Sequence, residues 1–305
     1  NNIMKRPLGQ TDLLLSPLGL GTWQFSKGTG IVGKFWGSLD DQLTEDIIKT
    51  SLDGGINWFD TAEVYGGGES EKILAKALNN ISTTPEEARI ATKWWPMFRT
   101  ATSLSKTIDT RKVALGNRPI DLYQIHQPYS LSSVEKQIKA MIELVKDGHI
   151  KHVGVSNFNA TAMVNSHRIL TDNGLTLASN QVKYSLLDRR IEENGTLESA
   201  KNLGISIIAY SPLEQGLLTG KFHDNPALIQ DAKGPRRLQR KFKEVGLAET
   251  KPLISLLDAI GEKYNVSASQ VALNWTIHYH GETVFAIPGA TKVHHAQDNV
   301  GALTF

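Results

Sequence analysis

The chain has 305 residues, 40% of them hydrophobic, so it can form one large domain or two ordinary ones with a sizeable core. Its formal charge of +2 is spread along the chain without a long basic block, which argues against nucleic acid as a partner. The absence of cysteine excludes disulfides, thiolate catalysis and cysteine-ligated metals, and no apolar run is long enough to cross a membrane.

The N-terminal residues show no signal-peptide pattern, and a chain without cysteine suits a reducing compartment. We therefore expect a cytoplasmic protein, although an organelle-targeting segment removed before Asn1 would leave no trace here. The composition indicates no particular oligomeric state.

Two N-terminal features precede the main body of the chain. Lys5–Leu15 is expected to form a short hairpin that turns at Gly9-Gln10 and caps one end of the fold. Gly28–Gly33 then matches G-x-G-x-x-G letter for letter, but the dinucleotide fingerprint needs a buried strand before it and a helix starting within it. Polar residues surround this copy, so we interpret it as a loop over the mouth of the fold. Gly66–Gly68 lacks the Gly-Lys-Ser/Thr of a P-loop and predicts a turn.

Eight short apolar segments alternate with longer amphipathic ones along the chain. Most of them are continuously apolar rather than strictly alternating, which is typical of parallel strands covered by helices. With a helix expected after nearly every strand and no linker, we predict a single closed (β/α)8 TIM barrel over residues 1–305, not an open sheet. The expected strands are Leu18–Leu20, Ile56–Phe59, Arg89–Thr92, Ile120–Ile125, His152–Val155, Leu177–Gln181, Ile205–Ala209 and Val284–Ile287.

Two capping boxes predict where helices begin between these strands. One is formed by Ser132 with Glu135, and the other by Ser267 with Gln270. Each precedes apolar residues that recur at helical spacing and would face the strands.

The stretch Pro212–Pro252 is long, polar and rich in Lys and Arg. A loop of this length in a compact domain is usually a lid or contains short helices, and we expect it to cover a cofactor. We interpret its basic part, Arg236–Lys243, as a solvated loop.

In a barrel, the residues at the carboxyl ends of the strands meet on one rim, where such folds place their active sites. Acidic, basic and aromatic side chains all occur there, a clustering that predicts an active site. The rim residues are Gly21-Thr22-Trp23, Asp60, Lys93-Trp94-Trp95, His126, Ser156-Asn157, Gln181, Tyr210-Ser211 and Pro288-Gly289.

Lys93 ends an apolar strand, where its amine would point into the barrel mouth. A buried lysine needs a carboxylate partner, and Asp60 at the end of the neighbouring strand is the natural one. A cation beside the phenol of Tyr65, in the loop after Asp60, would lower the tyrosine pKa towards a value useful for proton transfer. His126, which ends the fourth strand, can donate a hydrogen bond to a substrate carbonyl oxygen.

The histidines do not predict a metal site. His278 with His280, and His294 with His295, have spacings that put the two rings on different faces of a helix. We expect no metal.

These residues resemble the motifs of the aldo-keto reductase family, and the resemblance runs from Gly19–Trp23 to the end of the chain. The resemblance implies that Asp60, Tyr65, Lys93 and His126 form the family's catalytic tetrad. Hydride would pass from nicotinamide C4 to a carbonyl carbon while Tyr65 protonates the oxygen. Lys93, paired with Asp60, would tune Tyr65, and His126 would orient the carbonyl. The matching motifs are Phe59-Asp60-Thr61-Ala62 leading to Tyr65, the lysine after the third strand, Gly154-Val155-Ser156-Asn157-Phe158, Tyr210-Ser211-Pro212-Leu213 and Ile287-Pro288-Gly289-Ala290 ending in Asp298-Asn299.

The resemblance further implies a cofactor extended across the barrel top without a Rossmann fold. We expect NADPH, because its 2′-phosphate favours cations and helix N-terminal amides, which Lys292 and the start of the last helix supply. His295 stands where family members often carry Arg or Gln, so selectivity over NADH is expected to be modest. At the strand ends, the implied contacts are Gly21, Thr22, Trp23, Asp60 and Gly289. Around the nicotinamide, they are Ser156, Asn157 and Gln181 at the carboxamide and Tyr210 stacked on the ring. Along the rest of the cofactor, they are Ser211, Pro212, Leu213, Gln215, Gly216, Leu218, Thr219, Gly220 and Lys221 over the pyrophosphate, Thr291, Lys292 and His295 near the 2′-phosphate, and Asp298 and Asn299 at the adenine.

The expected partner is a small carbonyl compound, apolar or aromatic because several tryptophans end strands. Its pocket would be formed by Trp23, Tyr65, Trp94, Trp95 and His126, with Phe35 or Trp36 above; the alternative is that one or two of the tryptophans pack under the rim.

Two other functions compete with a reductase. The first is a non-catalytic, NADP-binding regulatory subunit like those of potassium channels, but these characteristically lack a histidine at the position of His126. The second is a barrel hydrolase or isomerase, which would need paired acids or His/Asp ligands at the strand ends, where only Asp60 and His126 qualify.

Overall fold

The structure is a computed structural model that describes residues 3–25, 40–231 and 234–305. Within these residues, eight parallel strands form one sheet in the sequential order β10-β9-β8-β7-β6-β5-β4-β3. A parallel bridge between Leu18 and Ala286, with hydrogen bonds on both sides of it, joins the first strand to the last and closes the barrel. The strands are β3 (Leu20–Gly21), β4 (Trp58–Asp60), β5 (Arg89–Trp94), β6 (Leu122–Ile125), β7 (His152–Ser156), β8 (Leu177–Lys183), β9 (Ser206–Tyr210) and β10 (Val284–Ala286).

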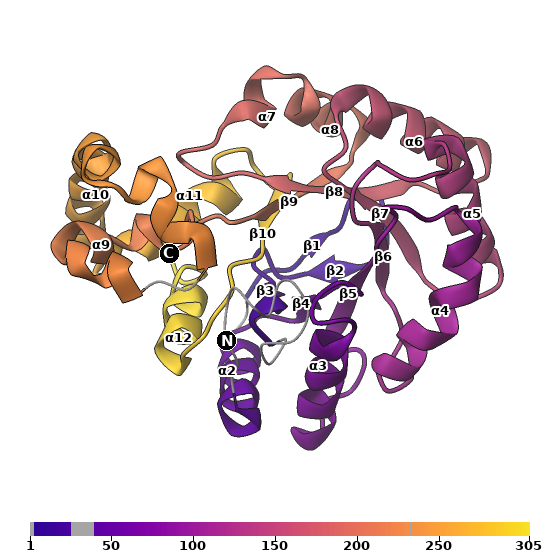
Figure 1. Cartoon of the computed structure of the whole chain (residues 1–305), viewed down its shortest axis with the longest axis horizontal. Helices are drawn as coiled ribbons and strands as arrows, with labels where there is room; N and C mark the ends of the chain where they lie inside the picture. The colour runs from indigo at the N-terminus through magenta and orange to yellow at the C-terminus, as the bar shows by residue number, and fades with distance from the viewer. Residues whose placement is uncertain (1–2, 26–39, 232–233) are drawn as a thin grey trace.

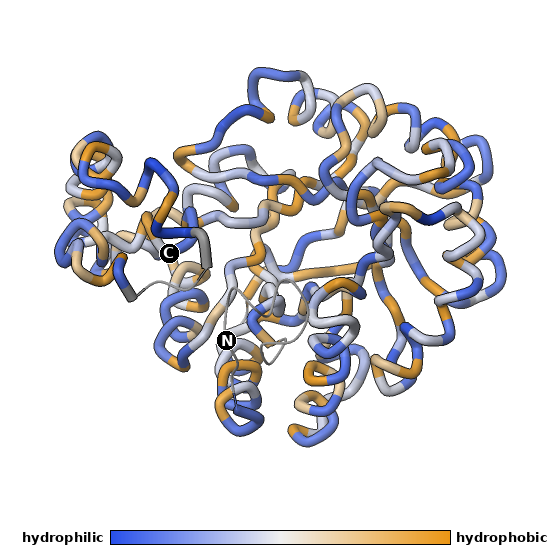
Figure 2. The backbone as a smooth tube through the Cα atoms, viewed as in Figure 1, coloured by the Kyte–Doolittle hydropathy of each residue, from blue (hydrophilic) through white to orange (hydrophobic). Residues whose placement is uncertain are grey.

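The predicted (β/α)8 barrel and all eight of its strands are thus confirmed. Helices surround the sheet (Figure 1). Along the longer helices, hydrophobic and hydrophilic residues alternate, as expected for helices with one buried face (Figure 2). The helices are α2 (Asp41–Asp53), α3 (Glu69–Asn80), α4 (Thr102–Ala114), α5 (Val134–Lys146), α6 (Ala160–Asp172), α7 (Arg190–Glu193), α8 (Thr196–Leu203), α9 (Lys221–Asp224), α10 (Glu244–Tyr264), α11 (Ala268–His278) and α12 (Val293–Gly301), with a 3-10 turn η1 (Trp23–Phe25).

The two expected capping boxes have different outcomes. Ser267 and Gln270 form the complete box at the start of α11, as predicted. The start of α5 was predicted one residue too early, because its N-cap is Ser133, which accepts a hydrogen bond from the backbone of Lys136. The hydroxyl of Ser132 instead accepts a hydrogen bond from the backbone N–H of Ala101.

The predicted N-terminal hairpin closes the lower end of the barrel. Strands β1 (Arg6–Pro7) and β2 (Leu14–Leu15) pair antiparallel, and Gly9 turns with a φ of 55°. Leu8, Leu13 and Leu15 pack against inward-facing strand residues. The hairpin is also tied to the last strands, since Arg6 donates to the carbonyl of Val284 at 3.0 Å. The inward-facing strand residues in this cluster are Trp58, Ala91, Leu122, Ala178, Ile208 and Phe285.

The long polar stretch after β9 contains short helices, one of the two structures expected for it. These are η2 (Leu217–Thr219), α9, η3 (Pro226–Asp231), η4 (Gly234–Leu238) and η5 (Arg240–Phe242), followed by α10. In Figure 1 this part, coloured orange, lies to one side of the barrel beside α11 and α12.

Gly66–Gly68 forms the expected turn, with positive φ at all three glycines. Gly28–Gly33, Phe35 and Trp36 lie outside the described residues. Within those residues, none of the helices is long and apolar enough to cross a membrane.

Candidate active site

The polar rim is built by the alternation of side chains along three neighbouring strands. Trp58, Ala91 and Leu122 point into the barrel and contact the hairpin floor. Two residues further along the same strands stand Asp60, Lys93 and Gln124, which therefore point inward one layer higher. All three are buried, with at most 1% of their surface exposed.

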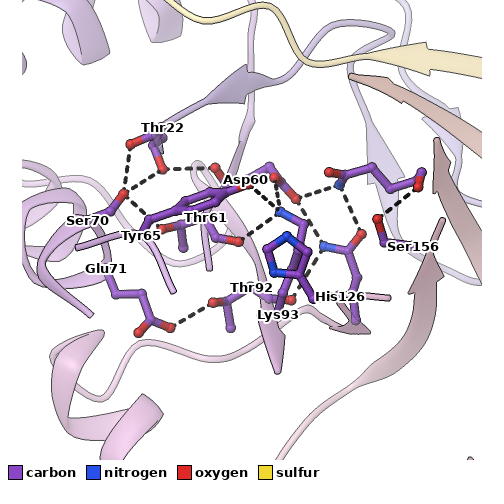
Figure 3. A network of polar contacts seen from close by, with 12 residues as sticks. Thr22, Asp60, Thr61, Tyr65, Ser70, Glu71, Thr92, Lys93, His126 and Ser156 are labelled. Atoms are coloured by element: carbon purple, nitrogen blue, oxygen red, sulfur yellow. Dashed lines mark hydrogen bonds and ion pairs between the residues drawn. The ribbon is translucent and has the colours of Figure 1, made fainter. Parts of the chain in front are cut away.

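The amine of Lys93 is the centre of this layer. Its three hydrogens reach Asp60 Oδ2 at 2.5 Å, the Thr61 carbonyl at 3.1 Å and the Tyr65 hydroxyl at 3.3 Å. Figure 3 shows Lys93 between Asp60 and Tyr65, with His126 beside it. The buried Lys93–Asp60 pair expected from the sequence is present, and Tyr65 lies next to it.

The second oxygen of Asp60 accepts two amide hydrogen bonds. Gln124 Nε2 donates to Oδ1 at 3.0 Å and Gln181 Nε2 at 2.9 Å. The sequence interpretation assigned Gln181 to the cofactor alone and missed Gln124. An inward-facing polar residue two positions before His126, in an otherwise apolar strand, is the signal that could have identified it.

The environment keeps both Lys93 and Tyr65 protonated. Burial by itself lowers the pKa of Lys93, but the neighbouring Asp60 and Tyr65 outweigh it, and the pKa lies above the ordinary value. Loss of water contact raises the pKa of Tyr65, and the adjacent Lys93 cancels only part of this rise. The expected net lowering of the Tyr65 pKa is therefore wrong, because desolvation outweighs the cation.

His126 is held by rings rather than by hydrogen bonds. Its ring meets Trp95 edge-on at 5.1 Å and Tyr65 edge-on at 5.9 Å between centroids. Within the described residues its buried Nδ1 atom has no hydrogen-bond partner. Burial, with a smaller contribution from Lys93, holds the His126 pKa well below its usual range, so the imidazole is neutral and carries one N–H.

Aromatic rings form an arc beside this layer. Trp23 lies 6.3 Å from Tyr65, and the arc continues through His126 to Trp95. Trp94 does not belong to it, contrary to the expectation that it lines a substrate pocket. Its side chain points out of the barrel, is fully buried, and donates from Nε1 to Ser103 Oγ at 2.7 Å.

The residues expected at a carboxamide come together on the opposite side of the mouth. Ser156 Oγ donates to the Gln181 carbonyl at 2.9 Å. The Tyr210 hydroxyl donates to Asn157 Oδ1 at 2.8 Å, and Asn157 has a φ of 58°. A positive φ at a non-glycine residue is uncommon and is typical of functional sites.

The segment Ser211–Lys221, expected over a pyrophosphate, is anchored to the barrel through Glu214. This buried carboxylate accepts from Ser185 Oγ at 2.5 Å and from Lys241 Nζ at 2.8 Å. Ser211, Glu214 and Gln215 all have positive φ. Among the predicted cofactor contacts, Leu218 cannot offer its side chain to a ligand. That side chain is fully buried in a hydrophobic cluster with the partly buried Leu213.

Three cations lie close together next to this segment. Burial lowers the pKa of Lys221, and the nearby positive charges of Arg236 and Lys292 lower it further. Arg236 donates to the Gln215 carbonyl at 2.8 Å and lies over the rings of Phe222 and Phe242. The interpretation of its basic stretch as a solvated loop is therefore wrong for Arg236, and also for Lys241, which pairs with Glu214.

The start of α12 lies beside these cations. The backbone N–H of Thr291 donates to His295 Nδ1 at 3.1 Å. Burial, followed by the positive neighbours, lowers the pKa of His295 to about 4, so this residue is neutral at physiological pH. Asn299 is buried and donates to the Gly289 carbonyl at 3.2 Å, while Asp298 is partly exposed.

A second charged cluster lies behind the mouth and was not predicted from the sequence. Glu63, in the loop before Tyr65, pairs with Arg111 at 2.6 Å, and Arg111 pairs with Glu71 at 3.1 Å. Glu71 also accepts from Thr92 Oγ1 at 2.7 Å. Burial raises the pKa of Glu71 to about 7, despite the lowering effect of Arg111.

Comparison with known proteins agrees with this geometry. The model of the Aldo/keto reductase family matches residues 17–305. The chain belongs to the aldo/keto reductase family. A chloroplastic pyridoxal reductase of Arabidopsis thaliana is 32% identical over 304 residues, which cover 95% of this chain and 80% of that protein.

Solved aldo/keto reductase structures share the fold. The glycerol dehydrogenase of Gluconobacter oxydans superposes with a TM-score of 0.83 at 29% identity, covering 99% of this chain and 90% of that one. An aldo-keto reductase of Klebsiella pneumoniae in complex with NADPH has a TM-score of 0.74 at 22% identity, covering 100% of this chain and 91% of that one. As an aldo/keto reductase, the protein is an oxidoreductase whose chemistry is carbonyl reduction.

Proposed function

We propose that this protein reduces aldehydes or ketones to alcohols with NADPH, and that Tyr65 donates the proton. The observation that carries the proposal is the placement of the Tyr65 hydroxyl 3.3 Å from Lys93 Nζ, next to a neutral histidine at the mouth of the barrel. When bound, the dinucleotide supplies a hydride to the carbonyl carbon. The chain itself must supply a proton to the oxygen and hold that oxygen in place.

Because its pKa is raised, the Tyr65 phenol stays protonated at neutral pH and carries the proton that the proposed reaction requires. The adjacent Lys93 ammonium is the group that favours release of that proton. As negative charge develops on the carbonyl oxygen, Tyr65 transfers its proton, and the adjacent Lys93 ammonium stabilises the phenolate that results. Asp60 keeps Lys93 charged at that position. His126, being neutral, donates its single N–H to the same carbonyl oxygen and orients it.

The carboxamide of the cofactor is assigned to Ser156, Asn157 and Gln181, with Tyr210 against the nicotinamide ring. The assignment is supported by their contacts with one another and by the contact of Gln181 with the catalytic layer. The other proposed contacts to the dinucleotide are Gly21, Thr22, Trp23 and Asp60, the segment Ser211–Lys221 over the pyrophosphate, and Gly289, Thr291, Lys292, His295, Asp298 and Asn299 at the adenosine end.

The choice of NADPH over NADH rests on the cations at the adenosine end. Lys221, Arg236 and Lys292 lie near one another and would together offer positive charge to a 2′-phosphate dianion, and the NADPH complex of the Klebsiella pneumoniae relative is consistent with this choice. Arg236 and Lys221 share a role that the sequence interpretation gave mainly to Lys292. Neutral His295 contributes hydrogen bonding rather than charge.

The arc of Trp23, Tyr65, His126 and Trp95 supports an apolar or aromatic carbonyl compound as substrate. NADPH oxidation should be measured over a panel of aliphatic and aromatic aldehydes, ketones and pyridoxal. The pyridoxal arm is motivated by the Arabidopsis relative.

The decisive variant is Tyr65→Phe, with Tyr264→Phe on the exposed face of α10 as the matched control. We expect Tyr65→Phe to lose about 10²–10⁴-fold in turnover and to keep its affinity for NADPH, since general acid catalysis is worth that much. Near-full turnover of Tyr65→Phe would show that the acid is misassigned. A wild type that binds NADPH but reduces no compound of the panel would favour the non-catalytic regulatory subunit.

A further inference from the structure

The carboxylate of Glu63 joins the loop that follows the second strand of the barrel to the loop that follows the third. Through Arg99, the connection extends to the loop that follows the fourth strand. Glu63 itself stands in the loop between Asp60 and Tyr65. Its Oε1 atom accepts from the backbone N–H of Trp95 at 3.0 Å and from Arg99 Nη1 at 2.6 Å. Its Oε2 atom pairs with Arg111 on α4 at 2.6 Å, which anchors the carboxylate from behind.

Arg99 extends the connection in both directions. Its Nη1 atom also donates to the Trp95 carbonyl at 3.0 Å. Its own carbonyl accepts from the Leu131 backbone at 2.9 Å and from Ser130 Oγ at 2.6 Å, in the loop that follows His126. The peptide groups on both sides of Trp95 are thus fixed by one ion pair.

The orientation of the His126 ring rests on its packing against the neighbouring rings, one of which belongs to Trp95. Within the described part of the chain, Nδ1 has no hydrogen-bond partner, so the ring is oriented by packing. Of the described rings that meet it, Trp95 is the nearer, at 5.1 Å, against 5.9 Å for Tyr65. A shift of the Trp95 backbone would therefore let the imidazole rotate and would misdirect its N–H.

We propose that Glu63 and Arg99 are positioning residues that act through Trp95 to orient His126 towards the substrate carbonyl. The inference rests on the role of His126 in the proposed function. The backbone N–H of Glu63 donates to the Lys93 carbonyl at 3.2 Å, a contact that side-chain substitutions leave in place. Among the described residues, the side chains of Glu63 and Arg99 bond to the loop after the third strand and to Arg111. They therefore affect the placement of one hydrogen-bond donor and leave the proton donor Tyr65 unchanged.

The test uses Arg99→Ala rather than a Glu63 variant, because removing Glu63 would deprive the buried Arg111 of one of its two partners and endanger folding. Arg99 is partly exposed, and its loss leaves the Glu63–Arg111 pair intact. We expect Arg99→Ala to lower kcat by roughly ten- to a hundredfold, the effect of a misplacement of about 1 Å, with the dissociation constant of NADPH unchanged. Arg99→Lys, which can restore one of the two contacts, should recover part of the loss. Arg168→Ala, which removes an exposed ion pair on α6, is the matched control and should keep the wild-type kcat.

The coupling to His126 is tested in the His126→Ala background by single-turnover hydride transfer. If Arg99 acts through His126, adding Arg99→Ala to His126→Ala lowers the rate by less than about twofold, the scatter expected for unrelated sites. A full additional loss in that background would show that Trp95 acts on the substrate directly and would overturn the proposal. An unchanged kcat in the Arg99→Ala single variant would also overturn it.

A readout without turnover separates this inference from the proposed function. In ¹⁵N-labelled protein, the imidazole signals of His126 are identified by their disappearance in His126→Ala. Arg99→Ala should shift them, and Arg168→Ala should not. If the wild type reduced no carbonyl, the proposed function would fail, yet a His126 signal that moves with Arg99 would still support the positioning role. An unmoved signal would refute that role whatever the activity.

Discussion

The carboxylate of Asp60 accepts a hydrogen bond from the side-chain amide of Gln181 at 2.9 Å, across the mouth of the barrel. The same Nε2 atom donates to Gln124 Oε1 at 3.1 Å, so both of its hydrogens are used within the protein. Among the described residues nothing donates to the side-chain oxygen Oε1 of Gln181, an acceptor that suits the NH₂ group of a carboxamide. The proposed cofactor contact and the Asp60–Lys93 ion pair therefore belong to one hydrogen-bond network.

Replacing the central carboxylate should destabilise the fold. Asp60→Asn leaves the Lys93 ammonium buried without its counter-ion, and breaking such a pair from one side costs about 3–5 kcal/mol. The cost should shrink at high pH, because Lys93 without Asp60 loses its proton more easily. Chemical denaturation at several pH values measures this effect. A double variant, Asp60→Asn with Lys93→Met, should be more stable than Asp60→Asn alone; if it were not, the buried charge would not be the cause.

Glu71 should make stability fall as the pH rises. Its folded pKa of about 7 lies above the ordinary value of 4.5, so between these values the folded state retains a proton that the unfolded state has lost. The free energy of unfolding therefore decreases from about pH 5 to pH 7, by at most about 3 kcal/mol for a shift of this size. Glu71→Gln should flatten that part of the stability curve. Glu135→Gln, at an exposed position on α5, serves as control, and an equally steep curve in Glu71→Gln would refute the assignment.

The cations at the adenosine end should separate the two dinucleotides. Lys292→Ala removes one exposed charge and should weaken NADPH binding by roughly ten- to a hundredfold while leaving NADH nearly unchanged. Arg236→Ala should weaken both cofactors, because Arg236 also holds the Gln215 carbonyl. Titrations of the wild type and both variants with NADPH and with NADH give the dissociation constants that test these expectations. Higher salt should reduce the wild-type preference for NADPH, and a wild type that binds NADH more tightly would contradict the cofactor assignment.

Trp94 and Trp95 should respond differently to the same substitution. Trp95→Phe alters the ring that meets His126 and should change kcat/KM across a panel of carbonyl compounds. Trp94→Phe should keep kcat/KM but lower the free energy of unfolding by about 1–3 kcal/mol, because it leaves the Ser103 hydroxyl without its indole partner. A change of substrate preference in Trp94→Phe would place that residue in the pocket after all.

Much of the fold follows from local patterns. Continuous apolar runs such as Ile205–Ala209 specify buried parallel strands, and a closed barrel then brings their carboxyl ends together whatever their separation along the chain. This is why the pairing of Lys93 with Asp60 could be predicted although the two residues lie on different strands. The same alternation, applied strictly, also puts Lys93 inside, Trp94 outside and Gln124 inside. Overlooking it produced the error at Trp94 and the omission of Gln124.

Other features depend on contacts that no local pattern encodes. The stretch around Arg236 has neither helical nor strand periodicity, and its docking on Gln215 and Phe222 is a product of the tertiary fold. The pKa of Tyr65 could not be anticipated either, because the sequence reveals a nearby cation but not how much water the surrounding rings remove. The network of Glu63, Arg111 and Glu71 joins a loop to two helices and has no signature in spacing.

The N-terminal hairpin limits the side from which solvent can reach the inward-facing residues Asp60, Lys93 and Gln124. Leu8, Leu13 and Leu15 seal the lower end of the barrel, and Trp58 and Phe285 fill the space above them, so an apolar plug insulates Lys93 from bulk solvent on that side. The Lys93 ammonium is fully enclosed, whereas Tyr65 is partly exposed at the mouth. In the proposed mechanism, the proton that restores Tyr65 after each turnover would therefore enter from the mouth, the side on which Tyr65 is exposed and from which the alcohol would leave.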